Sequence, residues 1–158
     1  MKSTCVPFLI LALPWMALGQ SPRPTGETRP PVKLDALTLE PEIRGKIDGF
    51  FTMLKQRKVA DAYRKLLDGS VLAEDNPELV EKLEESTARV IELTGRIHGT
   101  EILRIRSAGK TLREVTYLLT GEKRPLRWKF YFYLADGRWQ VLDTNVATEA
   151  SGFFDDEK

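Results

Sequence analysis

The chain has few of the residues on which metal, thiol and nucleotide chemistry depend. Among its 158 residues there is one cysteine, Cys5, and one histidine, His98. A single histidine excludes a histidine-rich metal site. The sequence contains no phosphate-binding loop, no Gly-x-Gly-x-x-Gly motif and no Gly-x-Ser-x-Gly nucleophile motif. We therefore expect neither a metal nor a cofactor.

The chain also lacks a dominant charge of one sign. It has 24 basic and 23 acidic residues, which gives a formal net charge of +1. Binding to nucleic acid depends on a strong positive field, and attraction to a membrane surface depends on a comparable excess of basic residues. We therefore expect neither nucleic acid nor a membrane surface as the partner.

The first nineteen residues have the pattern of a secretory signal peptide. Lys2 precedes an apolar run over residues 6–18, and small residues stand where a signal peptidase would cleave after Gly19. As a helix this run is about 20 Å long, whereas the hydrocarbon core of a bilayer is about 30 Å thick. Cleavage is therefore favoured over an uncleaved anchor. We expect export to the periplasm or the extracellular space, loss of Cys5 and no stable membrane anchor.

The composition divides the remaining chain into three parts. Residues 20–36 are rich in proline and are expected to be a linker. Residues 37–147 are enough for one globular domain. Residues 148–158 form an acidic tail, in which Phe153 and Phe154 either dock on the domain or remain free.

The first half of the domain has helical periodicity. Apolar residues recur at helical spacing over 42–58, and again over 59–67. A third helix is expected with Pro77 in its first turn and Gly95 at its end, because proline suits a first helical turn and glycine a helix end. Residues 70–73 are expected to be a short extended piece.

The second half has the period of two that is typical of strands. Strands are expected over residues 101–106, 111–120, 126–134 and 138–146, with a hairpin turn at Asp136-Gly137. The predicted fold class is therefore α+β, with three N-terminal helices packed on one face of a curved antiparallel four-stranded sheet.

The strand over 126–134 separates cleanly into two faces, because side chains alternate across a strand. A two-residue turn at Asp136-Gly137 places Leu134 opposite Trp139, and Phe132 opposite Val141. One face is wholly apolar and is expected to be the core: Leu126, Trp128, Phe130, Phe132 and Leu134.

The other face of this strand pair mixes aromatic and basic side chains. Tyrosine and arginine are favoured at protein interfaces, whereas lysine is not. The face therefore suits contact with another protomer, although an ordinary solvated face would have a similar composition. The residues predicted to form this interface are Lys129, Tyr131, Tyr133, Gln140 and Leu142.

The order of these elements resembles the nuclear transport factor two-like (NTF2-like, or cystatin-like) α+β cone over about residues 40–147. The resemblance lies in GFFTMLKQRKVADAYRKL, in TGRIHG at the end of the third helix and in the hairpin RPLRWKFYFYLADGRWQVLD. The opening helices are similar to those of secreted bacterial members of uncharacterised function. The resemblance implies a pocket between a curled sheet and its helices, and frequent homodimers through the outer sheet face. The superfamily includes ketosteroid isomerase-like and dehydratase-like enzymes as well as non-catalytic binding modules.

An enzyme of this type needs an acid or base in an apolar pocket and a donor that stabilises an oxyanion. Asp143 shares the parity of Trp139 and Val141, so it is expected to point toward the helices. Tyr63 and Tyr117 are the candidate donors. In the alternative interpretation, Asp143 lies at the solvent-exposed edge of the pocket and both tyrosines are hydrogen-bonded core residues.

Three functional hypotheses follow. The first is an exported, non-enzymatic module that binds a small apolar ligand or a protein partner and self-associates through the outer sheet face. The second is a small isomerase- or dehydratase-like enzyme that uses Asp143 with Tyr63 or Tyr117. The third is a purely structural envelope protein. A filled interior with exposed Tyr131 and Tyr133 favours the first or third, and an enclosed pocket with Asp143 on its wall favours the second.

Overall fold

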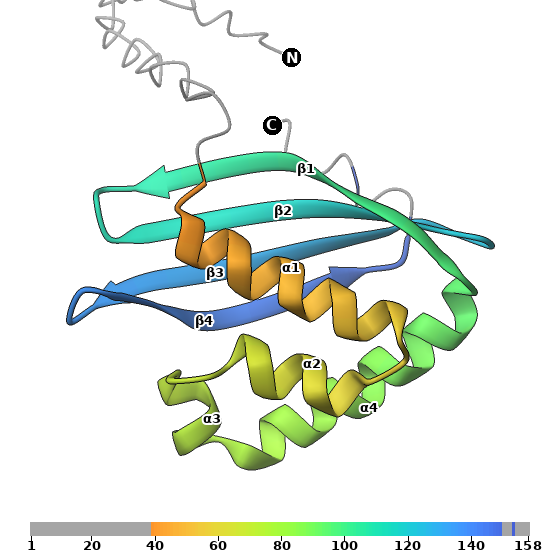
Figure 1. Cartoon of the computed structure of the whole chain (residues 1–158), viewed down its shortest axis with the longest axis horizontal. Coiled ribbons are helices and arrows are strands. Elements are labelled where there is room, and N and C mark those ends of the chain that lie inside the picture. Colours follow the sequence, from red (N-terminus) through yellow and green to blue (C-terminus); the bar gives the residue numbers. More distant parts are fainter. Residues whose placement is uncertain (1–38, 150–152, 154–158) are drawn as a thin grey trace, which may run out of the picture. The chain divides into compact units, whose positions relative to one another are not determined.

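The computed structural model describes residues 39–149 and Phe153. The predicted signal peptide, the predicted linker and all of the tail except residues 148–149 and Phe153 lie outside the described residues. The elements, in chain order, are α1 (Pro41–Lys55), α2 (Val59–Leu66), α3 (Val71–Asp75), α4 (Pro77–Thr94), β1 (Ile97–Ala108), β2 (Leu112–Gly121), β3 (Leu126–Ala135) and β4 (Arg138–Ala147) (Figure 1).

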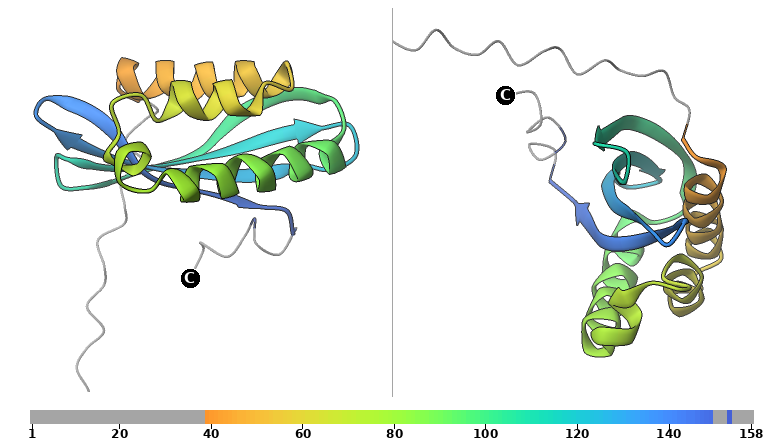
Figure 2. Two further views of the ribbon diagram at one scale, coloured as in Figure 1. Left: turned by 90° about the horizontal axis from the view of Figure 1, so that it is seen from below. Right: turned by 90° about the vertical axis from the view of Figure 1, so that its left-hand side faces the viewer.

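The fold class is α+β, as the sequence predicted. The four strands form one antiparallel sheet in the order β1-β2-β3-β4. The sheet curls, and α1 lies across its concave side (Figure 2). Helix α2 contacts both α1 and α4. We call the sheet surface that faces α1 the inner face, and the opposite surface the outer face.

The prediction of an extended piece over residues 70–73 was wrong. Only Ser70 is extended, and it caps α3, because its side-chain oxygen accepts a hydrogen bond from the Leu72 backbone N–H at 3.2 Å. The Ser70 hydroxyl also donates to the backbone carbonyl of Val141 on β4. Serine at this position therefore starts a helix and attaches it to the sheet, whereas the sequence was interpreted as continuing the extended backbone.

Helix α1 buries one face against the sheet. Pro41 occupies its first turn, where the missing N–H has no intrahelical partner to lose. The predicted apolar stripe is confirmed, because each of its side chains is at most 3% exposed: Ile43, Ile47, Phe50, Phe51 and Leu54.

The hairpin between β3 and β4 has the predicted two-residue turn. Asp136 and Gly137 both have positive φ, +49° and +76°, as the favoured tight hairpin turn requires. Leu134 pairs with Trp139, and Phe132 pairs with Val141. The predicted register of this end of the hairpin is confirmed.

The predicted inner face of β3 is confirmed as well. Its first four apolar side chains are at most 1% exposed, and Leu134 is half-buried against the core. Burying an aromatic side chain of this size stabilises the fold by about 2–3 kcal/mol, so this face supplies much of the driving force for packing α1 on the sheet.

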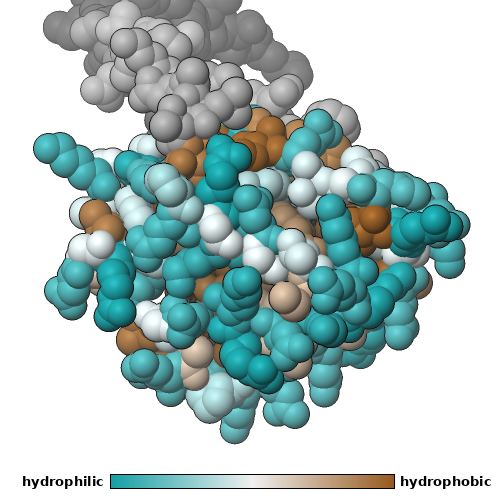
Figure 3. All heavy atoms as spheres, in the orientation of Figure 1, coloured by the Kyte–Doolittle hydropathy of each residue, from teal (hydrophilic) through white to brown (hydrophobic). Residues whose placement is uncertain are grey.

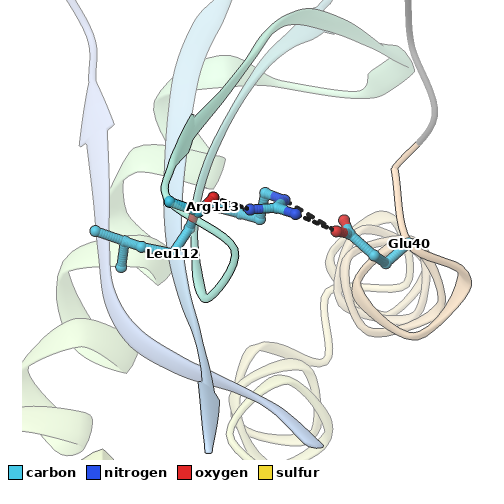
Figure 4. A network of polar contacts seen from close by, with 4 residues as sticks. Glu40, Leu112 and Arg113 are labelled. Carbon is cyan, nitrogen blue, oxygen red and sulfur yellow. Dashed lines mark hydrogen bonds and ion pairs between the residues drawn. The ribbon is translucent and has the colours of Figure 1, made fainter. Parts of the chain in front are cut away.

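The start of α1 is attached to the sheet by an ion pair. Arg113 on β2 donates from Nε to Oε1 of Glu40 at 2.9 Å, and its Nη2 forms an ion pair with the same oxygen at 2.8 Å (Figure 4). The same guanidinium lies over the ring of Trp139, 5.1 Å from its centroid. Glu42 accepts a longer bond, of 3.3 Å, from the Trp139 backbone N–H. These contacts connect the first turn of α1 to β2 and β4.

The side of the molecule that carries α1 is mainly hydrophilic, with scattered apolar residues (Figure 3). In the part of the chain that the structure describes, no helix is long and apolar enough to cross a membrane.

Candidate functional site

Aromatic rings occupy the space beneath α1, where the fold resemblance implies a pocket. The ring of Phe50 lies 5.3 Å from Tyr63, 5.1 Å from Trp128 and 5.6 Å from Phe130 between centroids, always edge to face. Phe50 and Phe130 are 0% exposed and Trp128 is 1% exposed. Side chains that line a cavity of ligand size have accessible surface, and these have almost none. The interior at this point is packed core.

Tyr63 on α2 is part of that core. It is 1% exposed, and its hydroxyl shares a 2.8 Å hydrogen bond with the hydroxyl of Thr87 on α4. Burial raises the pKa of Tyr63 from 10.0 to about 12, the Thr87 hydrogen bond lowers it, and the charge of Glu84 raises it further. The phenol therefore stays neutral across the physiological range, and its hydroxyl joins two helices.

Tyr117 on β2 is also buried, at 3% exposure. Its ring lies 5.3 Å from Phe51 and 6.2 Å from Phe130. Burial raises its pKa from 10.0 to about 12; the charge of Asp48 raises the pKa and that of Arg44 lowers it. Tyr117 and Tyr63 thus belong to one aromatic cluster but contact different members of it.

The expectation that Asp143 points toward the helices was wrong. The register shifts between Tyr131 and Phe132, so that Leu142 is an extra residue and Asp143 pairs with Tyr131 on the outer face. Asp143 is exposed, and its carboxylate accepts a 2.7 Å bond from the backbone N–H of Thr144. The structure therefore does not bring Asp143 together with Tyr63 and Tyr117.

Desolvation explains why the strand bulges at Leu142. Without the extra residue, alternation would turn Asp143 and Asn145 inward. With it, Thr144 lies opposite Phe130, and Val146 lies opposite Trp128. Burying a carboxylate without a partner costs far more than burying threonine and valine.

Thr144 makes this arrangement possible, and the sequence reasoning missed it. Thr144 is 5% exposed and accepts a 2.8 Å bond from the indole N–H of Trp128. Its hydroxyl donates in turn to the backbone carbonyl of Lys129 at 3.2 Å. A buried tryptophan usually needs such an acceptor, and this requirement is the signal that could have found Thr144.

An open groove of about 490 Å³ lies on the helical side, formed by α2, α3 and α4. Its lining includes Tyr63 and the apolar residues Leu67, Ala73 and Val80. Asp68, Glu74 and Glu84 also line it, with one basic residue, Arg64. The groove lies outside the inner face of the sheet, so it is not the pocket that the fold resemblance implies.

The predicted interface residues lie on or beside the outer face. Tyr133 pairs with Gln140 at the hairpin end, and Tyr131 follows in the next row opposite Asp143. Tyr133 is 43% exposed, as is Leu142 at the bulge, whereas Tyr131, Lys129 and Gln140 are half-buried. The outer face therefore presents aromatic and aliphatic surface beside polar groups.

Charges of both signs lie on this face in cross-strand rows. One row is Arg104, Thr116, Lys129 and Asn145, and the neighbouring row toward the hairpin is Arg106, Glu114, Tyr131 and Asp143. Within the second row, Arg106 and Glu114 are 3.8 Å apart, an ion pair that is too long for a hydrogen bond. Among the described residues, no group of three or more His, Cys, Asp and Glu side chains is placed to hold a metal ion.

The structure is similar to the crystal structure of a Campylobacter jejuni protein named as an NTF2-like transpeptidase. The two chains are 13% identical, with a TM-score of 0.43, over 65% of this chain and 97% of that one. No family model matches the sequence, and no curated protein is similar enough to match. A likeness at this level carries no information about activity.

Proposed function

We propose that this protein is an exported, non-enzymatic interaction module that self-associates through the outer face of its sheet. The observation that supports this most is the division of the hairpin. Its inner side chains are fully packed beneath α1, whereas Tyr133 and Leu142 on the other side are each 43% exposed. Exposed aromatic and aliphatic surface next to polar groups is typical of protein contacts.

The charges of the outer face suit contact with a second copy of the chain. In a twofold contact the same surface is used by both subunits, so a residue away from the axis meets a different residue of the partner. A face with Lys129 and Arg104 in one row, and Glu114 and Asp143 in the next, can place opposite charges across the twofold axis. Such complementarity fixes orientation more than it adds affinity.

The enzyme hypothesis has less support. It requires a carboxylate in an apolar pocket, and Asp143 is exposed on the opposite side of the sheet from Tyr63 and Tyr117. Burial raises the pKa of both tyrosines to about 12, so both stay protonated, as a donor must. They are at most 3% exposed, however, and the Tyr63 hydroxyl already bonds Thr87. A purely structural envelope protein remains the other alternative, and it shares the same contact surface.

Sedimentation equilibrium of the double variant Tyr131→Ser/Tyr133→Ser tests the proposal. We expect the unaltered protein to be a concentration-dependent dimer and the variant to be monomeric, because two rings leave the contact. Leu93→Ser is the matched control, since Leu93 is 54% exposed and belongs to α4, not to a strand of the outer face. A wild-type protein that is monomeric at every concentration, or a variant that dimerises as well as wild type, would refute self-association through this face.

Binding of a small apolar ligand is a second candidate, supported by the groove between α2, α3 and α4. Its apolar lining and its volume of about 490 Å³ are in the range of small-molecule sites. Native mass spectrometry of the purified protein would show a retained ligand as added mass. Ala60→Trp, which fills the groove from an exposed position, should remove that mass. Unmodified mass in both proteins would argue against this candidate.

Export is supported by the apolar run over residues 6–18 and the small residues before the expected cleavage point. Intact-mass analysis of the protein from the periplasm or the medium should give a chain that begins at Gln20. A chain that keeps residues 1–19 and stays with the cells would contradict export.

A further inference from the structure

The outer face has a basic part that lies beside the point where the chain leaves the sheet. Arg127 pairs with Ala147, the last residue of β4, and Lys129 and Arg104 lie in the adjacent cross-strand row. Beyond Ala147 the sequence becomes acidic, with Asp155, Asp156 and Glu157 close together. We propose that the segment 150–158 docks on Arg104, Arg127 and Lys129 of its own chain and competes with self-association; the competition rests on the proposed function.

The length of the segment is sufficient for this contact. An extended chain advances about 3.3 Å per residue, so the segment from Ala147 to Glu157 spans up to about 33 Å. Neighbouring strands are about 4.8 Å apart, so crossing from β4 to β1 requires only about 15 Å. Asp155 and Asp156 therefore reach the basic part with slack, even if the segment does not run straight.

The burial of the outer face also fits a covering segment. Thr116, in the same row as Arg104 and Lys129, is 3% exposed, and Arg127 is 8% exposed. Side chains at the centre of a solvated sheet face are ordinarily more accessible than this. Phe153, six residues after the end of β4, is half-buried, so its own side chain packs against other atoms.

Charge decides which occupant fits. A second copy of the chain offers Glu114 and Asp143 to the basic part, whereas the tail offers three acidic side chains at a high effective concentration. The two occupants need the same positive groups, so the tail is expected to weaken the dimer. Because exposed charges are screened by salt, the competition should fade at high ionic strength.

Docking is tested without reference to dimerisation by a pair of cysteines in a Cys5→Ser chain, which otherwise has no thiol. Asn145→Cys lies on the outer face beside Lys129, and Lys158→Cys lies at the far side of the acidic residues. The matched control pairs Lys158→Cys with Gln140→Cys, near the hairpin end of β4. In a glutathione redox buffer we expect the first pair to form its intramolecular disulfide at least tenfold more than the control pair.

Neutralising the tail with Asp155→Asn, Asp156→Asn and Glu157→Gln should bring the two pairs to equal disulfide formation. Equal formation before neutralisation, no change after it, or disulfides only between two chains would each overturn the docking proposal.

The competition is tested by sedimentation equilibrium of the chain that carries Asp155→Asn, Asp156→Asn and Glu157→Gln without the added cysteines. We expect its dimer dissociation constant to be at least threefold lower than that of the unaltered protein at low salt, and equal to it at 0.5 M salt, where the Debye length is only about 4 Å. An unchanged or higher dissociation constant at low salt would overturn the competition. If no protein dimerises while the disulfide pairs still differ, the proposed function fails and tail docking stands.

Discussion

Tyr131 on β3 and Asp143 on β4 lie opposite each other on the outer face of the sheet, because Leu142 is an extra residue in β4. This pairing moves a carboxylate from the predicted pocket to the solvent. It also turns Thr144 inward, where its hydroxyl accepts a hydrogen bond from the indole N–H of Trp128. The bulge thereby decides both the composition of the core and the composition of the outer face.

The bond between Trp128 and Thr144 should be visible in the stability of the fold. Thr144→Val keeps the shape of the side chain but leaves the Trp128 indole N–H buried without an acceptor. We expect the free energy of unfolding in urea to fall by about 1–3 kcal/mol. Thr144→Ser keeps the hydroxyl and should lose about 1 kcal/mol or less. Asp143→Asn, the neighbouring exposed change, should stay within about 0.5 kcal/mol. Equal losses in all three would contradict the assignment.

The ion pair between Arg113 and Glu40 should stabilise the attachment of α1. Arg113→Lys keeps the charge but loses the planar fork and the stacking on Trp139, so we expect a loss of about 1–2 kcal/mol. The pair is mostly screened from solvent, with side chains 17% and 29% exposed. The control is Arg89→Lys, whose 3.6 Å pair with Glu85 is largely exposed and should matter little. Comparable effects at both sites would show that the α1 contact has no special role.

Stability should fall at high pH because two tyrosines are buried in the neutral form. The pKa of each is raised from 10.0 to about 12 in the folded state, so the contribution is complete below pH 10 and is lost as the pH rises toward 12. Each tyrosine accounts for up to about 2–3 kcal/mol of this loss. Tyr63→Phe should flatten the curve of unfolding free energy against pH between 10 and 12. An unchanged slope in Tyr63→Phe would show that Tyr63 is not the group that titrates.

Regular patterns explain how much of the fold the sequence predicted. The apolar stripe of α1, the inner face of β3 and the turn at Asp136-Gly137 depend on neighbouring residues and on local backbone geometry, and all three were correct. Such features repeat with a fixed period, so they can be deduced without knowledge of the rest of the chain.

The errors arose where one residue broke the period. The alternation of β4 holds from Trp139 to Val141 and then reverses, because Leu142 bulges. The reversal is decided by the cost of burying Asp143 compared with the cost of burying Thr144, whose hydroxyl accepts a bond from the Trp128 indole. This difference depends on β3, the partner strand, which the local pattern of β4 does not include. Ser70 is a similar case, since its hydroxyl caps a short helix while it also bonds a distant strand. The filled interior depends likewise on long-range packing, in this case of Phe50 against β3.

Under the proposed function, the outer face and not the interior is the functional surface. A dilution series of ¹⁵N–¹H correlation spectra of the protein tests this proposal, because amide shifts that depend on concentration mark the residues in contact. We predict that the shifts concentrate at residues 129–133 and 140–143, while amides of the helical groove, such as those of Leu67 and Val80, stay constant. Shifts confined to the groove, or spectra that do not change over a hundredfold dilution, would contradict the claim.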